Sequence, residues 1–310
     1  MIQSFRQHPF AMGFLLAIVG TALFSLKSIF IKLAYVEGLN ADSVLMIRMA
    51  IALPIYLVIL AWLIKTKPMP EGLTSKLLNI TLLGFIGYYL SSWLDLKGLE
   101  MISAQLERLT LFTYPILVAI LGALFFNTPL TRKIVLALII TYGGLWIVFM
   151  EELSISGENV PLGTLFVFLA ALSFSFYVLF GKNLIQQIGS LWFTSLAMSV
   201  SSAFVLIHFA IIGDFENLHI TNLAWLWLVL LAVVSTVIPS FMISEAIHKI
   251  GPAQTGIIGI LGPIMTMGLA IYLLNEAFTI WHLLGMCLVI CGVAILTIKK
   301  NPFHRFNKVK

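Results

Sequence analysis

The sequence contains ten runs of mostly apolar residues, each about twenty residues long. An α-helix of this length crosses about 30 Å of hydrocarbon at about 1.5 Å per residue. The chain is 60% hydrophobic and 10% charged, unlike an ordinary globular protein. We therefore expect an all-α integral membrane protein with ten transmembrane helices. Their expected ranges are 11–34, 42–64, 77–96, 102–126, 132–150, 161–181, 190–212, 222–246, 253–274 and 279–298.

Basic residues gather on one side of the membrane when the loops are assigned to its two sides in alternation. This side carries Arg6, Lys65, Lys67, Lys76, Arg132, Lys133, Lys182, Lys249, Lys299, Lys300, Arg305, Lys308 and Lys310. The other side carries one base, Lys97, and the acids Glu37, Asp42, Glu100, Glu151, Glu152, Glu158, Asp214, Glu216 and Glu276. The positive-inside rule then predicts a multi-pass protein of the cell (inner) membrane with both termini cytoplasmic. The net charge of +5 indicates anionic lipid headgroups, not nucleic acid, as partners.

The second half of the chain repeats the first. A shift of 150 residues pairs Gly13, Phe24, Ser25, Phe30 and Lys32 with Gly163, Phe174, Ser175, Phe180 and Lys182. A shift of 148 pairs Pro115, Asn127, Thr131 and Gly144 with Pro263, Asn275, Thr279 and Gly292. Each half holds five spans, an odd number, so the halves must have inverted topology, as in many secondary transporters. We expect a cytoplasmic segment at 1–10, five-helix repeats at 11–150 and 161–298, and a basic cytoplasmic tail at 299–310.

These paired blocks resemble the EamA-type members of the drug/metabolite transporter superfamily over nearly the whole chain. The blocks are Ile102-Ser103-Ala104, Pro115, Asn127-Thr128-Pro129-Leu130-Thr131 and Gly144, then Gly251-Pro252-Ala253, Pro263, Asn275-Glu276-Ala277-Phe278-Thr279 and Gly292. Arg48 fits the same pattern. The resemblance implies ten helices and the export or exchange of small organic solutes such as amino acids, metabolites or drugs. The family usually has Gly-Glu before the threonine of this motif, so any role of that glutamate survives here only at Glu276.

Motifs for other chemistry are missing from the sequence. It has no phosphate-binding glycine loop, no metal-spaced His/Cys set, no nucleophile elbow and no paired carboxylates on one helix face. We therefore expect no enzyme activity, no metal and no cofactor. The alternative to a transporter working by alternating access is a sensor or assembly subunit that kept the fold without carrying a solute. A membrane-embedded enzyme would need a catalytic cluster that the sequence does not offer. The sequence is also compatible with a homodimer.

Charged residues inside the first four spans are the candidate binding groups. Lys27, Arg48 and Arg108 are each expected roughly 10 Å below the outer surface, and Asp95 lies at a similar or shallower depth. Gln105 shares the Arg108 face of its helix, whereas Glu107 points about 100° away. One interpretation is that the bases snorkel outward or pair with Asp95 and Glu107 to tie helices together. The functional interpretation is that they bind a carboxylate or another anionic group, with Asp95 as the proton-coupling residue.

Further candidates come from aromatic, hydroxyl and amide residues within the spans. A mostly apolar pocket with a few placed polar groups suits a small organic molecule, and many such residues merely pack. The additional candidate binding residues are Tyr88, Trp93, Tyr114, Ser175, Tyr177 and Gln254. Glu245 is a weaker proton-coupling candidate, because Lys249 lies one helical turn on. The symmetry mates Pro115 and Pro263 are hinge candidates, and the glycines at 256, 259 and 262 indicate close helix packing.

Overall fold

The computed structural model describes residues 9–126, 131–213, 218 and 220–297, and this part of the chain is helical with short connections. The N-terminal residues 1–8, the motif residues Asn127 to Leu130 and the tail from residue 298 lie outside the described residues. The helices of the first half are α2 (Pro9–Ser25), α3 (Lys27–Val36), α4 (Ala41–Thr66), α5 (Leu73–Gly84), η1 (Phe85–Leu90), α6 (Ser91–Leu99), α7 (Ala104–Leu111), α8 (Tyr114–Phe126) and α9 (Arg132–Ser156). Those of the second half are α10 (Val160–Ile188), α11 (Ser190–Ile212), α12 (Asn222–Ala232), η2 (Val233–Val237), α13 (Ile238–Ile258), α14 (Leu261–Leu274) and α15 (Ile280–Thr297).

The expected ten-helix membrane fold is confirmed. Nine helical segments among the described residues are long and apolar enough to cross a membrane, and the tenth, Ile280–Ile295, is a shorter apolar helix. The helices run past the expected ends where polar residues continue them. The third span covers Leu73–Leu99, and the fifth reaches Ser156 through Glu151 and Glu152. Glutamate has a high helix propensity, so its charge ends an apolar run without ending the helix.

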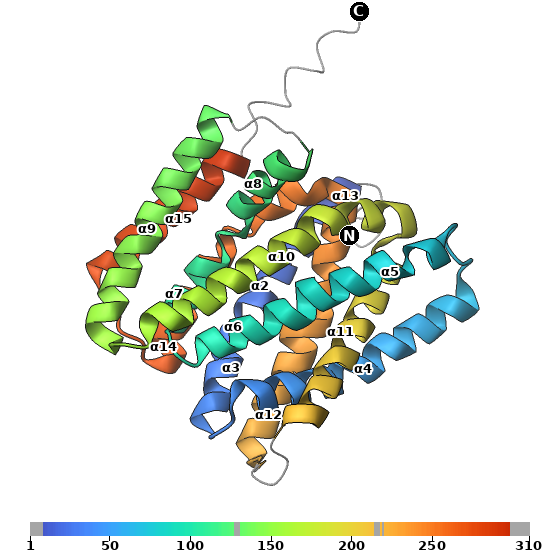
Figure 1. Ribbon diagram of the computed structural model, residues 1–310, viewed down its shortest axis with the longest axis horizontal. Coiled ribbons are helices and arrows are strands. Elements are labelled where there is room, and N and C mark those ends of the chain that lie inside the picture. The colour runs from blue at the N-terminus through green and yellow to red at the C-terminus, as the bar shows by residue number, and fades with distance from the viewer. Residues whose placement is uncertain (1–8, 127–130, 214–217, 219, 298–310) are drawn as a thin grey trace, which may run out of the picture.

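Several spans are made of two pieces (Figure 1). The first span turns at Leu26 between α2 and α3, and the fourth is broken at residues 112–113 between α7 and α8. The ninth is broken at residues 259–260, before α14, and Gly251 with φ of 82° separates it from the eighth. The third and eighth spans each contain a π-helical turn, η1 and η2. The paired breaks and the paired π turns differ by about 148 residues, so the symmetry extends to these irregularities.

Close helix contacts are exchanged between the two halves, as a two-fold axis requires. A Cβ atom on Gly144 would lie 2.7 Å from the carbonyl oxygen of Gly285, and one on Gly292 would lie 2.9 Å from that of Ala137. A shift of 148 residues converts the first pair into the second. These contacts join α9 to α15, which lie side by side in Figure 1. Because each half crosses the membrane five times, the halves have inverted topology.

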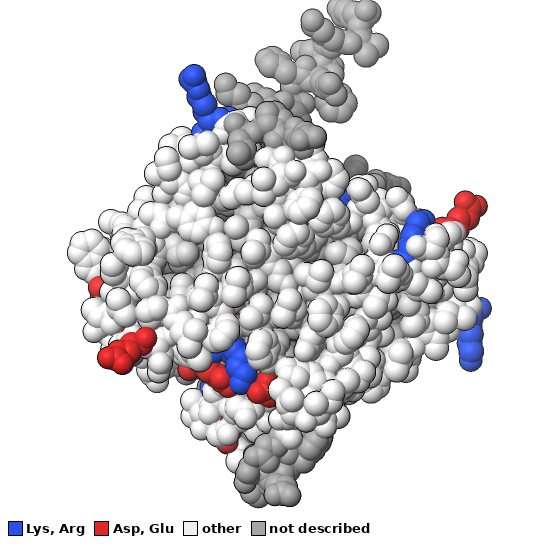
Figure 2. Space-filling view, in the orientation of Figure 1, with Lys and Arg blue, Asp and Glu red and all other residues white. Residues whose placement is uncertain are grey.

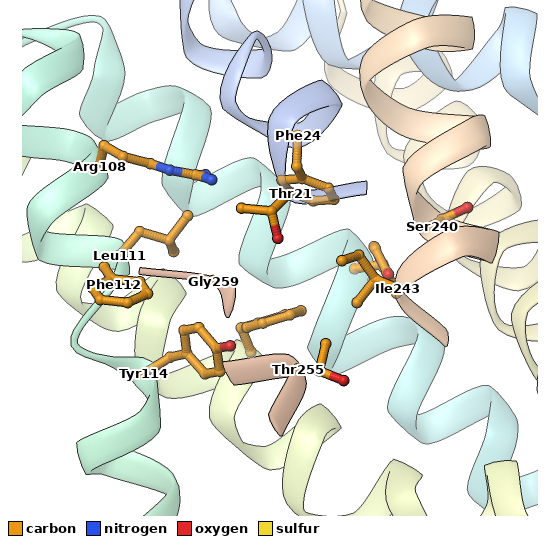
Figure 3. A pocket seen from close by; sticks show the side chains of 12 residues that line it. Thr21, Phe24, Arg108, Leu111, Phe112, Tyr114, Ser240, Ile243, Thr255 and Gly259 are labelled. Carbon is orange, nitrogen blue, oxygen red and sulfur yellow. The ribbon is translucent and has the colours of Figure 1, made fainter. Parts of the chain in front are cut away.

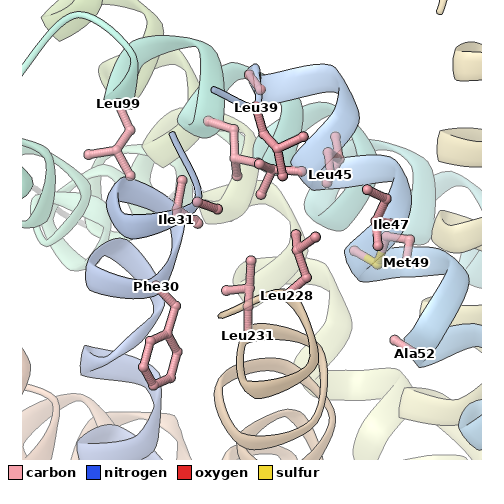
Figure 4. Packing of buried hydrophobic residues seen from close by; sticks show 14 of the residues in the cluster. Phe30, Ile31, Leu39, Leu45, Ile47, Met49, Ala52, Leu99, Leu228 and Leu231 are labelled. Carbon is pink, nitrogen blue, oxygen red and sulfur yellow. The ribbon is translucent and has the colours of Figure 1, made fainter. Parts of the chain in front are cut away.

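The largest apolar cluster joins α3, α4, α6 and α12 (Figure 4). Ile31, Leu45 and Met49 are almost wholly buried there. Helices in lipid gain little from leaving a solvent as apolar as their own side chains, so close packing stabilises this contact. The outer surface is apolar as well: Val58 and Ile139 are each 67% exposed, and Figure 2 shows a wide area without charged side chains. Such a surface suits contact with lipid tails.

Candidate functional site

A cavity of about 110 Å³ lies between the broken spans. Its lining comes from both halves of the chain: Thr21, Phe24, Tyr88, Arg108, Leu111, Phe112, Tyr114, Phe174, Ser240, Ile243, Thr255 and Gly259. Figure 3 shows the Arg108 side chain reaching from α7 toward Phe24, and its guanidinium carbon lies 5.9 Å from the centre of that ring. The cavity is therefore an aromatic chamber with one buried cation.

A second cavity of about 60 Å³ adjoins the first and is more polar. Phe24, Tyr88, Leu111 and Phe174 line both cavities and lie between them. The second is also lined by Lys27, Arg48, Gly87, Ser91, Ser92, Asp95, Ser235 and Thr236. Together the cavities form one site in which a polar chamber and an aromatic chamber share these four residues.

Lys27 holds two carboxylates at this site. Its ammonium forms a short ion pair with Asp95 and lies 3.5 Å from Oε1 of Glu107. All three side chains are buried. The sequence left open whether Lys27 pairs with acidic residues of neighbouring helices or binds the substrate. The structure shows the ion pairs, and both carboxylate partners are buried.

The two arginines, in contrast, have no carboxylate partner. No carboxylate oxygen of the described residues lies within 4.0 Å of the nitrogens of Arg48 or Arg108. Arg48 Nη2 donates to Ser92 Oγ at 3.1 Å, and Nε of both arginines has no hydrogen-bond partner. A buried charge costs several kcal/mol unless a counter-charge and hydrogen bonds compensate it. The site therefore holds two buried guanidinium groups that lack an ion pair and part of their hydrogen bonds.

Hydrogen bonds across the helix breaks position these charges. Ser25 ends α2; its Oγ donates to the Thr21 carbonyl at 2.8 Å and lies 3.3 Å from the Gly262 carbonyl, and the Ser25 carbonyl accepts from Thr266 Oγ1 at 3.0 Å. The bond from Thr266 ties the break in the first span to α14. Gly262 also gives Arg108 its space, because a Cβ there would lie 2.7 Å from Nη2 of that arginine. Gly259 lines the larger cavity, so this glycine stripe serves the site as well as helix packing.

Polar contacts lie at the ends of the spans where the acidic loops are. Lys97 pairs with Asp42 at 2.8 Å. Glu276 accepts the backbone N–H of Ala104 at 2.7 Å and that of Gln105 at 3.3 Å, so it caps helix α7 from the opposite half. Burial raises the pKa of Glu276, and the Ala104 N–H and the charge of Lys32 oppose that rise. The retained motif glutamate thus links the two halves.

Several residues that the sequence singled out lie away from both cavities. Trp93 donates to Asp42 Oδ1 at 2.9 Å, and Gln105 donates to the carbonyl of Ala277 at 3.0 Å. Gln254 is exposed, and Glu245 pairs with Lys249 at 3.0 Å as the sequence allowed.

Two further candidates pack beside the site. Ser175 Oγ donates to the carbonyl of Ala171 at 2.6 Å and lies 3.2 Å from that of Tyr114, and the Tyr177 ring packs 4.9 Å from the Tyr88 ring. The remaining candidates, Lys27, Arg48, Tyr88, Asp95, Arg108 and Tyr114, all line a cavity. Pro115 and Pro263 each lie just beyond a helix break.

Sequence reasoning did not find the apolar and hydroxyl part of the lining. Phe24, Leu111, Phe112 and Phe174 look like ordinary lipid-facing or packing residues in the sequence. The one signal was the repeat itself, because Phe24 and Phe174 are symmetry mates and both lie between the two cavities. Ser28, which bonds Glu107, carried no signal at all. The described residues contain no group of three His, Cys, Asp or Glu side chains that could hold a metal ion.

Comparison with known proteins adds to this geometry. Residues 11–150 and 161–298 each match the model of the EamA-like transporter family. The uncharacterised transporter YcbK of Bacillus subtilis is 29% identical over 97% of this chain and 96% of its own length. The uncharacterised transporter YdfC of the same organism is 26% identical over 73% of each chain. A protein of known crystal structure has the same fold, with a TM-score of 0.67 at 13% identity over 92% of this chain and 96% of its own.

Proposed function

The chain belongs to the EamA-like transporter family, and on that premise we propose that this membrane transporter carries small organic carboxylates by alternating access. The observation that supports the substrate class is the pair of buried arginines at the cavities, neither of which has a carboxylate partner within the described part of the chain. A carboxylate can accept two parallel hydrogen bonds from a guanidinium, which matches what each arginine lacks. The solute itself supplies the missing counter-charge.

The aromatic chamber limits the size and character of the solute. An engineered cavity of about 150 Å³ holds benzene, so a chamber of about 110 Å³ accepts a small apolar or aromatic group. Tyr88, Tyr114 and Phe174 would pack around this group while an arginine binds its carboxylate. Amino acids and short aromatic or branched acids combine these two features.

Alternating access would use the breaks in the spans. The fourth and ninth spans are broken at symmetry-related points, and Pro115 and Pro263 keep those points from re-forming a continuous helix. Each proline is thus a hinge about which an outer or an inner gate can move. We propose that the protein lies in the inner membrane with both termini in the cytoplasm. We expect net transport to be export or exchange, and the flux measurement described next gives its direction.

The test uses Arg48→Gln and Arg108→Gln in proteoliposomes loaded with radiolabelled benzoate, pyruvate or phenylalanine. We expect each variant to reduce flux of the transported acid about 10- to 100-fold, since a hydrogen bond to a charged group contributes about 1.5–3 kcal/mol. Lys249→Gln removes a cation of the eighth span whose partner is Glu245, and it should leave flux unchanged.

Folded yield, measured by size-exclusion chromatography, separates the two interpretations of the arginines. Normal yield with lost flux supports a binding role. Yield that falls in step with flux leaves only a structural role. Flux of all three acids that is unaffected by either substitution contradicts the proposal.

A further inference from the structure

Glu107 is the most deeply buried charged residue near the site. Its side chain has no exposed area, and it does not line either cavity. Ser28 Oγ donates to its Oε2 at 2.6 Å. Its Oε1 lies 3.5 Å from Lys27 Nζ and has no hydrogen-bond partner. One oxygen of this carboxyl group is therefore satisfied, and the other is not.

Asp95, like Glu107, has one carboxyl oxygen without a hydrogen-bond partner. Asp95 Oδ2 pairs with Lys27, but Oδ1 is buried and has no hydrogen-bond partner. The Asp95 and Glu107 carboxyl groups approach the same ammonium, that of Lys27. Two ionised carboxylates would face each other as acceptors only, with one ammonium between them. A single proton on one of them provides the donor that both unpartnered oxygens lack.

The surroundings of Glu107 determine which carboxyl group takes this proton. From α3, Lys27 and the more distant Lys32 face it; from α6, Asp95 does; and Arg108 follows it on α7. From α9, Glu152 interacts electrostatically with Lys32. In α10 the only charged residue is Lys182, and α14 has none. Lys27 makes its close contact with Asp95, so Asp95 keeps the negative charge and Glu107 is left with the weaker counter-charge.

We propose that Glu107 is the proton-binding residue of this transporter, and that one proton on its Oε1 and the substrate anion bind together. The proton enters from the polar cavity, which Lys27 and Asp95 line, and passes to Glu107, which lies outside its lining. The second half of this statement rests on the carboxylate transport proposed above, whereas the proton site does not.

Charge explains why proton and anion bind together. With both carboxyl groups ionised, Lys27, Arg48 and Arg108 leave a net charge of +1 at the site. A proton on Glu107 raises that charge to +2 and so favours an anion. By linkage, the anion favours the proton to the same degree. Proton and solute then move in the same direction, and their combined gradients determine which direction that is.

The first test detects the proton directly, without any solute. Infrared spectra of the purified protein in nanodiscs are recorded over a pH series, and the C=O stretching band of a protonated carboxylic acid is followed. We expect a buried band that Glu107→Gln removes and Glu245→Gln leaves in place. Asp95→Asn should keep a carboxyl band or shift its midpoint. A band that disappears in Asp95→Asn but persists in Glu107→Gln, or the lack of any such band, overturns the proposal.

The second test measures coupling through calorimetric binding of benzoate, pyruvate and phenylalanine as a function of pH. For the wild type we expect affinity to fall about tenfold per pH unit above the midpoint of the infrared titration. Glu107→Gln, which fixes the neutral form, should make affinity independent of pH. Glu245→Gln should keep the wild-type dependence.

The two tests separate the two proposals. If none of the three acids binds but the Glu107 band is present, the carboxylate proposal fails and the proton site stands. If an acid binds with the same pH dependence in wild type and Glu107→Gln, the proton site is wrong while carboxylate transport stands.

Discussion

The first turn of α7 shows how single residues account for buried backbone groups. The first four N–H groups of a helix have no partner within it. In α7, Glu276 accepts those of Ala104 and Gln105, and Ser103 Oγ accepts that of Leu106 at 3.1 Å. The N–H of Glu107 donates to the Ser103 carbonyl at 3.0 Å, which is the first bond of the regular helix. Side chains thus satisfy three N–H groups at the start of α7, and two of these bonds depend on one side chain from the other half of the chain.

Replacing Glu276 should therefore destabilise the protein. We expect Glu276→Ala to cost about 0.5–2 kcal/mol, as the loss of a helix cap does, and Glu276→Gln to cost less because its amide oxygen still accepts. The measurement is thermal unfolding in detergent. Burial raises the pKa of Glu276 above its ordinary value of 4.5. The group's contribution to stability is then complete below about pH 4.5 and decreases as the pH rises through the folded pKa.

The advantage of the wild type over Glu276→Ala should accordingly shrink as the pH rises above about 4.5. A difference that grows with pH over this range would show that the ionised carboxylate is favoured at the helix end and that our account of its burial is wrong.

Of the candidate residues chosen from the sequence, the charged ones in the first four spans line a cavity, whereas the amide residue Gln105 does not. Lys27, Arg48, Asp95 and Arg108 could be found from the sequence because a charge within a membrane span is costly and so needs a reason. Gln105 lies on the Arg108 face of its helix, as the spacing predicted, yet its amide bonds the carbonyl of Ala277. Helical spacing gives the direction of a side chain but not the loop from the other half that meets it.

At the scale of elements, the irregular turns make the site. A π-helical turn inserts an extra residue and rotates the face that follows, so η1 turns Ser91, Ser92 and Asp95 toward the polar cavity. The breaks at residues 112–113 and 259–260 open the space that the larger cavity fills. The sequence located the prolines near both breaks. It did not locate the π turns, because the glycine of η1 and the β-branched residues of η2 are also common in regular transmembrane helices.

Helix packing at α9 and α15 offers a matched pair of glycines. A Cβ at Gly144 would lie 2.6 Å from Leu288 Cβ and 2.7 Å from the Gly285 carbonyl, whereas one at Gly143 would meet nothing within 4 Å. We expect Gly144→Ala to lower the thermal unfolding temperature, since backbone atoms must move. Gly143→Ala should leave it unchanged or raise it, because alanine favours a helix over glycine by about 0.5–1 kcal/mol.

The same experiment has a symmetry control. Gly292 is the mate of Gly144, and Gly292→Ala should lower the unfolding temperature by a similar amount, because its Cβ would meet Thr141 and Ala137 equally closely. Equal effects of Gly143→Ala and Gly144→Ala would contradict the close α9–α15 contact.

At the scale of the whole molecule, the two halves share a fold but not a chemistry. Under the shifts that relate them, Lys27 corresponds to Tyr177, Glu107 to Thr255 and Arg108 to Gly256. The charged groups thus come from the first half, while the second half adds neutral lining such as Ser240, Ile243 and Thr255. The repeat in the sequence predicted the inverted fold because symmetry needs only shape. The asymmetric site depends on contacts between halves, which no pattern within one half can reveal.

The charges predict an orientation of the molecule in the membrane, and labelling can test it. Thirteen basic residues lie on the side assigned to the cytoplasm, against Lys97 alone on the other. Glu158 and Lys67 are exposed on opposite sides in this assignment. In a background without Cys287 and Cys291, we expect an impermeant maleimide to label Glu158→Cys on intact cells and Lys67→Cys only after permeabilisation. Glu152 is buried, which makes Glu158 the better position on its loop. Labelling of Lys67→Cys on intact cells, with Glu158→Cys protected, would reverse the orientation and place the acidic loops in the cytoplasm.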